Sequence, residues 1–399
     1  MTHKIAHIAD IHFRGYKRHA EYRQIMEQFF SSCRDEKIDA FVISGDIVHS
    51  KTQNITPELI EMLTWWFNQM SQIAPVHVTL GNHDGLLTNL TRQDTITPVI
   101  SAINSDRIFL YKKSGAYPIL GNACDLVVFS PFDEDRWDEV KNIPLDRNFS
   151  IATFHGAIAG CVSDSGWALS TDADVSYFEK YDFAMLGDIH KRQNLDIEGR
   201  VAYPGSMIQQ NFGEDKEKGF LLWEISSRNE WKKKFIELSP VQPYVTIDWK
   251  GDFLTSVNSA NLSAEDLKNA RVRIRSEVPL SQVKTRDLAK KLKDAFDTHE
   301  VYFKHKSVRR ETSTEVESAV MTVERDPRSL AKMVVDFGYV EPESEVIIDK
   351  MIEIIKSTSK KILPTEVSGG KTWSLGKMEW DNTYGYGSDN YIDFSNMSG

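Results

Sequence analysis

The chain is poor in cysteine, has no long apolar run and has too few basic residues to balance its acids. Its three cysteines lie far apart and form no CxxC pair. A disulfide framework and a cysteine-only zinc site are therefore excluded, and we expect a reducing compartment. No apolar run approaches the ~20 residues of a membrane-spanning helix, and the first residues lack the apolar core of a signal peptide. We expect a soluble protein with no membrane partner, in the cytoplasm of a bacterium or, if viral, of the host cell.

The shortage of basic residues limits the kind of nucleic-acid binder that this chain can be. Lys and Arg number 48 against 58 Asp and Glu, which gives a formal net charge of −10. A protein that binds nucleic acid mainly through a bulk positive field is therefore excluded. A nuclease is still allowed, because metal ions can neutralise phosphate locally. With 399 residues and 41% hydrophobic content, the chain has the composition of a folded protein of two or three domains.

Short apolar runs alternate with amphipathic stretches over the first 200 residues. We predict strands at 5–11, 40–44, 76–80, 150–154 and 183–186, and helices at 20–33 and 57–70. This order of strand, helix and strand, with polar residues at the strand ends, is typical of an α/β fold. In such folds ligands bind beyond the carboxyl ends of the strands.

A polar cluster follows each of these predicted strands. In chain order the clusters are Asp10-x-His12, Gly45-Asp46, Gly81-Asn82-His83-Asp84, His155 and Gly187-Asp188-x-His190. Residues two apart on an extended segment point the same way, so we expect Asp10 and His12 to face one ligand. Carboxylate, amide and imidazole donors together suit Mn, Fe or Zn better than Ca or a pure Mg site. Asp46 can bridge two ions through its two oxygens, and a two-ion site suits displacement at phosphorus.

Each cluster alone has an ordinary structural explanation. A single histidine after a strand is more often a hydrogen-bonded structural residue, and Asp-x-His occurs by chance. Gly-Asn-His-Asp could be only a turn, since Gly and Asn favour turns. Five such clusters in this order, each after a strand, are poorly explained by structure alone.

The order of these motifs resembles the signature of the calcineurin-like metallophosphoesterase superfamily over roughly residues 1–220. Within it, three stretches are similar to the SbcD-like nuclease subunits of SbcCD-type complexes. These stretches are Gly45-Asp46-Ile47-Val48-His49, residues 181–193 and Tyr203-Pro204-Gly205-Ser206. The resemblance implies an α/β protein with a metallophosphoesterase β-sandwich core flanked by helices. A smaller α+β capping domain and C-terminal helices would follow.

The resemblance also implies two Mn²⁺ ions as cofactors, with Mg²⁺ or another divalent metal as a substitute. One ion would be held by Asp10, His12, Asp46 and His190. The other would be held by Asp46, Asn82, His155 and Asp188.

Three further expectations concern individual residues of this site. His83 would not ligate but would donate to the phosphate or the leaving oxygen, and His49 would assist positioning or proton transfer. Asp188 stands where the family usually has the first histidine of its Gly-His-x-His motif. Because carboxylate is a competent ligand for Mn, we expect a working, more anionic second site. The alternative is a weakened second ion and lower activity.

The character of the sequence changes after about residue 240. Strands are predicted at 244–249, 270–275 and 301–303, and helices at 286–296, 327–337 and 343–361. We divide the chain into a nuclease domain at 1–240, a DNA-capping domain at 241–312, helices at 313–365 and a flexible aromatic and acidic tail at 366–399. The helices at 313–365 would dock on the coiled coil of an ATPase partner.

Basic residues gather in the predicted capping domain. Nine Lys and Arg against four acids lie between Lys284 and Arg310. Arg271, Arg273 and Arg275 alternate on a predicted strand and so share one face. Contact with DNA phosphate and an ordinary solvated surface are both left open by this pattern.

The resemblance implies an Mn-dependent DNA nuclease with 3′–5′ exonuclease and single-strand endonuclease activity. It would process DNA ends in recombination and repair with an SbcC-like ABC-type coiled-coil ATPase, as a homodimer within a heterotetramer. Two alternatives stay open: a stand-alone metallophosphoesterase acting on a small phosphodiester, and a catalytically weak scaffold subunit at DNA ends. The long C-terminal part argues against the first, whereas Asp188 is the feature that favours the second.

Overall fold

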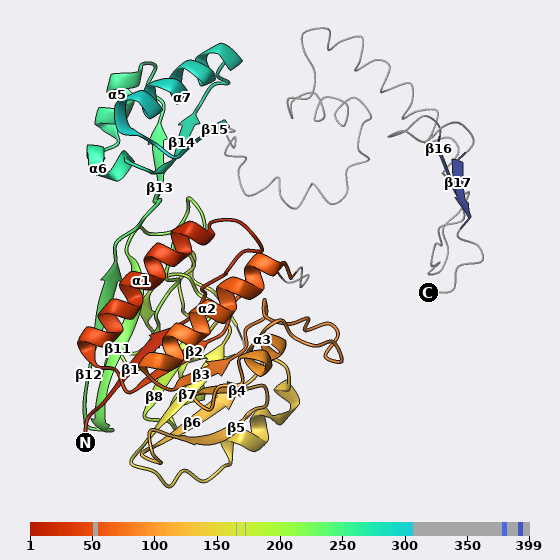
Figure 1. The fold of residues 1–399 in the computed structure, drawn as a ribbon, viewed down its shortest axis with the longest axis vertical. Coiled ribbons are helices and arrows are strands. Elements are labelled where there is room, and N and C mark those ends of the chain that lie inside the picture. The colour runs from red at the N-terminus through yellow and green to blue at the C-terminus, as the bar shows by residue number, and fades with distance from the viewer. Residues whose placement is uncertain (51–54, 165, 172, 306–376, 381–389, 394–399) are drawn as a thin grey trace, which may run out of the picture. The chain divides into compact units, whose positions relative to one another are not determined.

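The computed structural model describes residues 1–50, 55–164, 166–171, 173–305, 377–380 and 390–393. The chain divides into two compact units, residues 1–308 and 309–399. Among the described residues, the first unit contains two six-stranded sheets, a three-stranded sheet and seven α-helices (Figure 1).

The first six-stranded sheet is covered on one face by three helices. Its strands, in spatial order, are β12 (Glu230–Leu238), β11 (Lys218–Ser227), β1 (His3–Ile8), β2 (Ala40–Ser44), β3 (Val76–Thr79) and β4 (Ile108–Tyr111). The helices are α1 (His19–Glu36), α2 (Pro57–Ile73) and α3 (Ile96–Ile103). Figure 1 shows α1 and α2 side by side over this sheet, and Phe29 and Trp66 bury their rings beneath them.

The second six-stranded sheet packs against the other face of the first. Its strands, in spatial order, are β5 (Gly115–Ile119), β6 (Cys124–Phe129), β7 (Phe149–His155), β8 (Phe183–Gly187), β10 (Val201–Tyr203) and β9 (Gln193–Asn194). Ile5 and Val42 of the first sheet share one buried cluster with Leu126 and Met185 of the second. The short helix α4 (Trp137–Lys141) lies on its outer face, where Trp137 packs against that sheet's outer core.

This sandwich explains why the inner strands are almost continuously apolar. In β1, Ile5 faces the second sheet, whereas Ala6 and Ile8 face the helices. Successive side chains point to opposite faces, and both faces are buried, so apolar residues are favoured on each. The buried polar residue of β1, His7, has a partner in the Leu186 carbonyl, 3.1 Å from its Nε2. The prediction of an α/β fold with a β-sandwich core flanked by helices is confirmed.

The small domain differs from its predicted class. It consists of β13 (Tyr244–Asp248), α5 (Phe253–Ser259), α6 (Ala264–Leu267), β14 (Arg271–Ser276), α7 (Gln282–Phe296) and β15 (Glu300–His305). All three strands are parallel, in the order β13-β14-β15. Because helices connect consecutive strands, each connection is a crossover and the strands align. The domain is therefore an α/β unit, and the expectation of an α+β arrangement was wrong.

The arginines of β14 lie on one face of the strand but are not equally available. Arg271 is buried and its guanidinium pairs with Glu21 of α1, with an Nη2–Oε2 distance of 2.8 Å. Arg275 pairs with Asp248 of the neighbouring strand, and Arg273 donates to the Thr246 hydroxyl. Arg271 thus ties the small domain to the core and is not free to contact DNA phosphate.

Two short strands of the second unit are described. β16 (Lys377–Trp380) and β17 (Asn390–Asp393) pair antiparallel. The predicted helices at 327–337 and 343–361 lie outside the described residues, and the boundaries predicted at 240, 312 and 365 stay predictions. No helix in the described part of the chain is both long and apolar enough to cross a membrane.

A buried histidine at the far end of the sandwich predicts acid sensitivity. The His77 ring stacks on Phe109 and Tyr111 at 16° to each, and its Nδ1 lies 2.9 Å from the Tyr111 hydroxyl. Burial lowers the pKa of His77 from 6.5 to about 4. The unfolded chain therefore binds this proton first, and the cost of burying a neutral ring grows as the pH falls from 6.5 to 4.

We expect the wild-type protein to lose about 3 kcal/mol of unfolding free energy between pH 7 and pH 4 relative to His77→Gln, which cannot titrate. Urea unfolding of both proteins, free of metal, measures this difference at each pH. A constant difference between the two proteins across this range would contradict the assignment.

Candidate metal centre

The predicted site residues meet at one edge of the sandwich. Asp10, Asp46 and Asn82 follow β1, β2 and β3 of the first sheet, whereas His155 ends β7 and Asp188 follows β8 of the second. The carboxyl ends of these parallel strands lie together. The structure therefore brings side chains that are up to 180 residues apart in sequence into one cluster.

The local reason given for pairing Asp10 with His12 was wrong. Strand β1 ends at Ile8, and both residues have left-handed backbone, with φ of 54° and 53°. Asp46 and Asp188 also have positive φ, at 55° and 96°. Such conformations cost energy and concentrate at functional sites. The two side chains converge because their turns aim them, and main-chain bonds such as Asp10 N to Gly45 O hold those turns.

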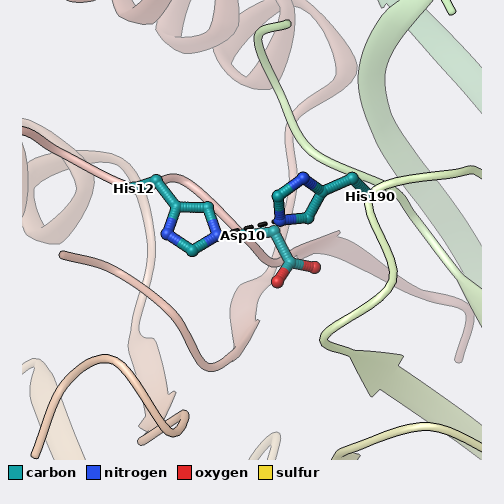
Figure 2. A group of neighbouring side chains, drawn as sticks. All are labelled: Asp10, His12 and His190. Atoms are coloured by element: carbon teal, nitrogen blue, oxygen red, sulfur yellow. Dashed lines mark hydrogen bonds between the residues drawn. The ribbon is translucent and has the colours of Figure 1, made fainter. Parts of the chain in front are cut away.

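The first group of possible ligands is Asp10, His12 and His190. Figure 2 shows the two rings turned toward each other with Asp10 beside them, and their Nε2 atoms are 2.9 Å apart. His190 Nδ1 donates to the Glu214 carboxylate at 2.9 Å, since a carboxylate can only accept. The free Nε2 of His190 is thereby aimed into the site, as in metal-ligating histidines.

The second group contains Asp46, Asn82, His155 and Asp188. His155 Nδ1 donates to the Ser44 carbonyl at 2.7 Å, so its Nε2 faces Asp46 Oδ1 at 3.2 Å and Asp188 Oδ1 at 3.7 Å. Asn82 Nδ2 lies 3.4 Å from Asp188 Oδ1. Asn82 Oδ1 is buried and has no hydrogen-bond partner. Buried polar atoms are rarely left so, which points to an absent ligand.

Asp46 lies between the two groups. Its Oδ1 faces His155, and its Oδ2 lies 3.6 Å from His12 Nε2. A Cβ atom at Gly81 would overlap the Asp46 carboxylate, so only glycine permits this approach. The donors are carboxylates, imidazoles and one amide, and they fit a pair of divalent cations.

The cluster carries perturbed charges when no cation is bound. Burial raises the pKa of Asp10 to about 7. Burial opposes ionisation of Asp46 too, but the nearby His155 outweighs it and lowers that pKa. For His190, burial is overcome by Glu214 and Asp10, which raise its pKa to about 9. These shifts favour the protonated forms of Asp10 and His190, whereas burial lowers the pKa of His12 well below its ordinary value.

His83 and His49 lie beside the cluster. His83 also forms, with His12 and Asp46, a group that could hold a metal ion, so its expected role as a residue that does not ligate stays a prediction. His83 Nδ1 donates to the His49 carbonyl at 2.7 Å, and its Nε2 is 3.9 Å from Asp46 Oδ2. The two rings stack with centroids 6.1 Å apart. Burial, followed by the charge of Arg14, lowers the pKa of His49 to about 4. His49 is therefore neutral at pH 7.

The sequence interpretation missed the residues that support the ligands. Glu214, which orients His190, is buried. It belongs to none of the sequence motifs that were used to predict the site. Burial opposes its charge, but His190 and Lys218 lower the pKa of Glu214 to about 2. Asp84 was quoted in a motif without a role; its Oδ1 accepts from the main-chain N–H groups of Ile47 and Val48 at 2.8 and 3.0 Å. Asp84 thus fixes the Asp46 loop against its neighbour.

A two-sheet α/β sandwich with this centre at the ends of its strands is the metallophosphoesterase fold. Residues 3–192, just under half of the chain, match the model of the calcineurin-like phosphoesterase family. The match supports placing this part of the chain in the calcineurin-like metallophosphoesterase superfamily.

Three curated proteins are similar to this chain. Protein R555 of Acanthamoeba polyphaga mimivirus is 27% identical over 98% of this chain, which spans only 30% of R555. Protein 244L of Invertebrate iridescent virus 6 is 26% identical over 68% of this chain and 92% of its own length. The double-strand break repair protein Mre11 of Haloferax volcanii is 22% identical over 62% of this chain and 55% of its own length.

Two solved structures resemble the chain more distantly. The Plasmodium protein GAP50 has a TM-score of 0.34 and 14% identity, over 59% of this chain and 84% of that one. A dimetal phosphatase from Danio rerio has a TM-score of 0.34 and 13% identity, over 60% of this chain and 99% of that one. At these scores neither structure supports a further conclusion.

The carboxylate at position 188 predicts a change in metal preference. We expect Asp188→His to bind Zn²⁺ more tightly relative to Mn²⁺, by about tenfold, because imidazole is the softer donor. Calorimetric titration of the metal-free variant and wild type with each metal measures the two affinities. An unchanged ratio of affinities would show that this position does not tune the metal.

Proposed function

We propose that this chain is a Mn²⁺-dependent DNA nuclease that acts with an SbcC-like coiled-coil ATPase on DNA ends. The observation that carries the proposal is the centre itself, in which Asp46 faces two groups of donors and His83 lies beside it. When bound, the ions would supply charge neutralisation and activation of water for phosphodiester hydrolysis.

The chain's own residues have distinct tasks in this proposal. Glu214 and the Ser44 carbonyl hold His190 and His155 in the orientation that ligation needs. His83 keeps one proton on Nδ1 through the His49 carbonyl. Its Nε2 would then face the phosphate or the leaving oxygen, which is the position that general-acid assistance requires. His49, as a neutral ring stacked on His83, would position the phosphate without adding charge.

Three features support DNA as the substrate. Mre11 of Haloferax volcanii, a protein named for double-strand break repair, is similar over 62% of this chain. A small α/β domain follows the core and is joined to it by the Glu21–Arg271 pair. Part of the net negative charge comes from the carboxylates of the metal centre, Asp10, Asp46 and Asp188, and bound cations would offset that part. The ATPase partner and the homodimer within a heterotetramer rest on the motif resemblance alone.

A stand-alone phosphoesterase is the second candidate. Protein 244L, a phosphoesterase by name, is matched over 92% of its length by only 68% of this chain. A stand-alone phosphoesterase of the length of 244L would therefore not use the rest of this chain, which argues against this candidate. Hydrolysis of a small phosphodiester without any cleavage of DNA would favour this candidate over the nuclease.

The purified full chain, with Mn²⁺, should be incubated with linear duplex DNA, circular single-stranded DNA and bis(p-nitrophenyl) phosphate. The same reactions are repeated with the SbcC-like ATPase of the same source, which should accelerate cleavage of duplex ends. We expect His83→Gln to abolish DNA cleavage while Mn²⁺ binding persists, and His3→Gln, at the far end of β1, to act as wild type. Binding of DNA without cleavage, or hydrolysis of the small ester alone, would overturn the nuclease assignment.

A further inference from the structure

One loop of the core, residues 206–218, contacts both the metal centre and the small domain. We call it the bridging loop. It begins at Ser206, shortly after β10, and ends at Lys218, the first residue of β11. Neither the sequence motifs nor the family resemblance gave this loop a role beyond the tetrapeptide at its start.

The inner side of the bridging loop holds His190 at two places. Its Glu214 accepts from His190 Nδ1 at 2.9 Å. The His190 carbonyl accepts from Ser206 N at 3.1 Å and from Lys218 Nζ at 3.0 Å. The ring and the main chain of this ligand are therefore both fixed by the same loop.

Glu214 owes its own position to the fold of the bridging loop. Its carboxylate accepts from the Ser206 hydroxyl and from Gln210 N, both at 3.0 Å, and from Lys218 Nζ at 2.9 Å. Asn211 Nδ2 donates to it at 3.0 Å. Because these partners all belong to the loop, a change in loop conformation would move the carboxylate and with it the His190 ring.

The outer side of the bridging loop docks on the small domain. Gln209 Oε1 accepts from Tyr244 N at 2.9 Å, which anchors the loop to the first residue of β13. The Phe212 ring lies edge-on to Tyr244 and Tyr302, with centroids 4.7 and 5.5 Å away. The Arg273 guanidinium lies over the same ring at 4.6 Å. All three strands of the small domain therefore contact Phe212 or its neighbour.

We propose that the bridging loop is a positioning element through which the small domain sets the divalent-metal affinity of the His190 site. Gln209 joins the two sides, since its Nε2 donates to the Glu214 carbonyl at 3.0 Å while its Oε1 contacts the small domain. A ligand that displaces the small domain, such as a DNA strand, would then change metal affinity, and metal would change DNA affinity by the same factor. This inference rests on the proposed metal centre.

The test measures Mn²⁺ binding to the full chain by electron paramagnetic resonance, with no substrate. We expect Glu214→Gln to weaken one of two sites by about 10- to 100-fold, as loss of a ligand's supporting carboxylate does. Phe212→Ala should weaken the same site by about fivefold or more, and Phe212→Tyr, which keeps the ring, should restore it. Phe109→Ala, a partly exposed aromatic at the other end of the sandwich, is the matched control and should not change binding.

Nitrogen-15 NMR of the metal-free protein gives a second readout, because the His190 ring signals report its hydrogen bond to Glu214. The chemical shifts of these ring nitrogens should differ from wild type in Phe212→Ala and equal those of wild type in Phe109→Ala. Unchanged Mn²⁺ affinity and unchanged His190 signals in Phe212→Ala would overturn the coupling while leaving the metal centre intact. A wild-type protein that binds no Mn²⁺ would instead overturn the proposed function.

Discussion

Replacing Asp46 by asparagine should lower phosphodiester hydrolysis by at least ~10³-fold, because two cations would supply several kcal/mol of transition-state stabilisation. The two oxygens of Asp46 face different donor groups, with Oδ1 3.2 Å from His155 Nε2 and Oδ2 3.6 Å from His12 Nε2. An amide offers a single oxygen and no charge, so it cannot serve both groups. Mn²⁺ content after equilibrium dialysis should fall from two ions per chain to one or none.

The control for this variant is Asp39→Asn. Asp39 lies at the opposite end of the same strand, where its carboxylate accepts from Lys4 N at 2.7 Å. It has the same chemistry but no place in the cluster, so metal content and activity should stay as in wild type. If Asp46→Asn kept both ions and its turnover, Asp46 would not bridge and the two-ion interpretation would fail.

Replacing Glu21 by alanine should lower the free energy of unfolding by about 3–5 kcal/mol, the usual cost of breaking a buried ion pair. The Glu21 carboxylate accepts from Arg18 Nε and from Arg271 Nη2, both at 2.8 Å. Without it two guanidinium groups lose their counter-charge within a joint that is largely closed to water. Urea unfolding followed by circular dichroism measures the loss, and limited proteolysis between β12 and β13 reports whether the small domain is released first.

Asp248→Ala is the matched control, since Asp248 also pairs with an arginine of β14. That pair is half exposed, with 45% of the Asp248 side chain open to solvent. Exposed ion pairs contribute about 0–1 kcal/mol, so this variant should be close to wild type. Equal losses in the two variants would show that burial does not set the strength of the Glu21–Arg271 joint.

The sequence was most informative about polar residues that directly follow a predicted strand. Val42 and its neighbours predict a buried strand from composition alone, and ligands collect at the carboxyl ends of such strands whatever the strand order. Asp46 could therefore be placed in the site without knowledge of the two sheets. The end of β1 could not be predicted. The left-handed backbone at Asp10 and His12 leaves no recognisable pattern in the sequence Asp-x-His.

Residues whose roles depend on distant partners were beyond the sequence. Alternation predicts that Arg271 shares a face with Arg275, but it cannot tell that the face is closed at one end by Glu21, 250 positions earlier. Glu214 is an ordinary acid in a polar loop until the fold brings it to His190. In both cases a buried charge is explained only by the partner that neutralises it.

The pairing of β11 with β1 has a consequence for synthesis of the protein. His3 and Lys4 pair with Ile225 and Glu224, so the first strand made is completed by strands made more than 200 residues later. Until then β1 is an edge whose open main-chain groups can pair with another chain. Nascent chains and products truncated before Lys218 should therefore aggregate or require chaperones, although they contain every predicted metal ligand.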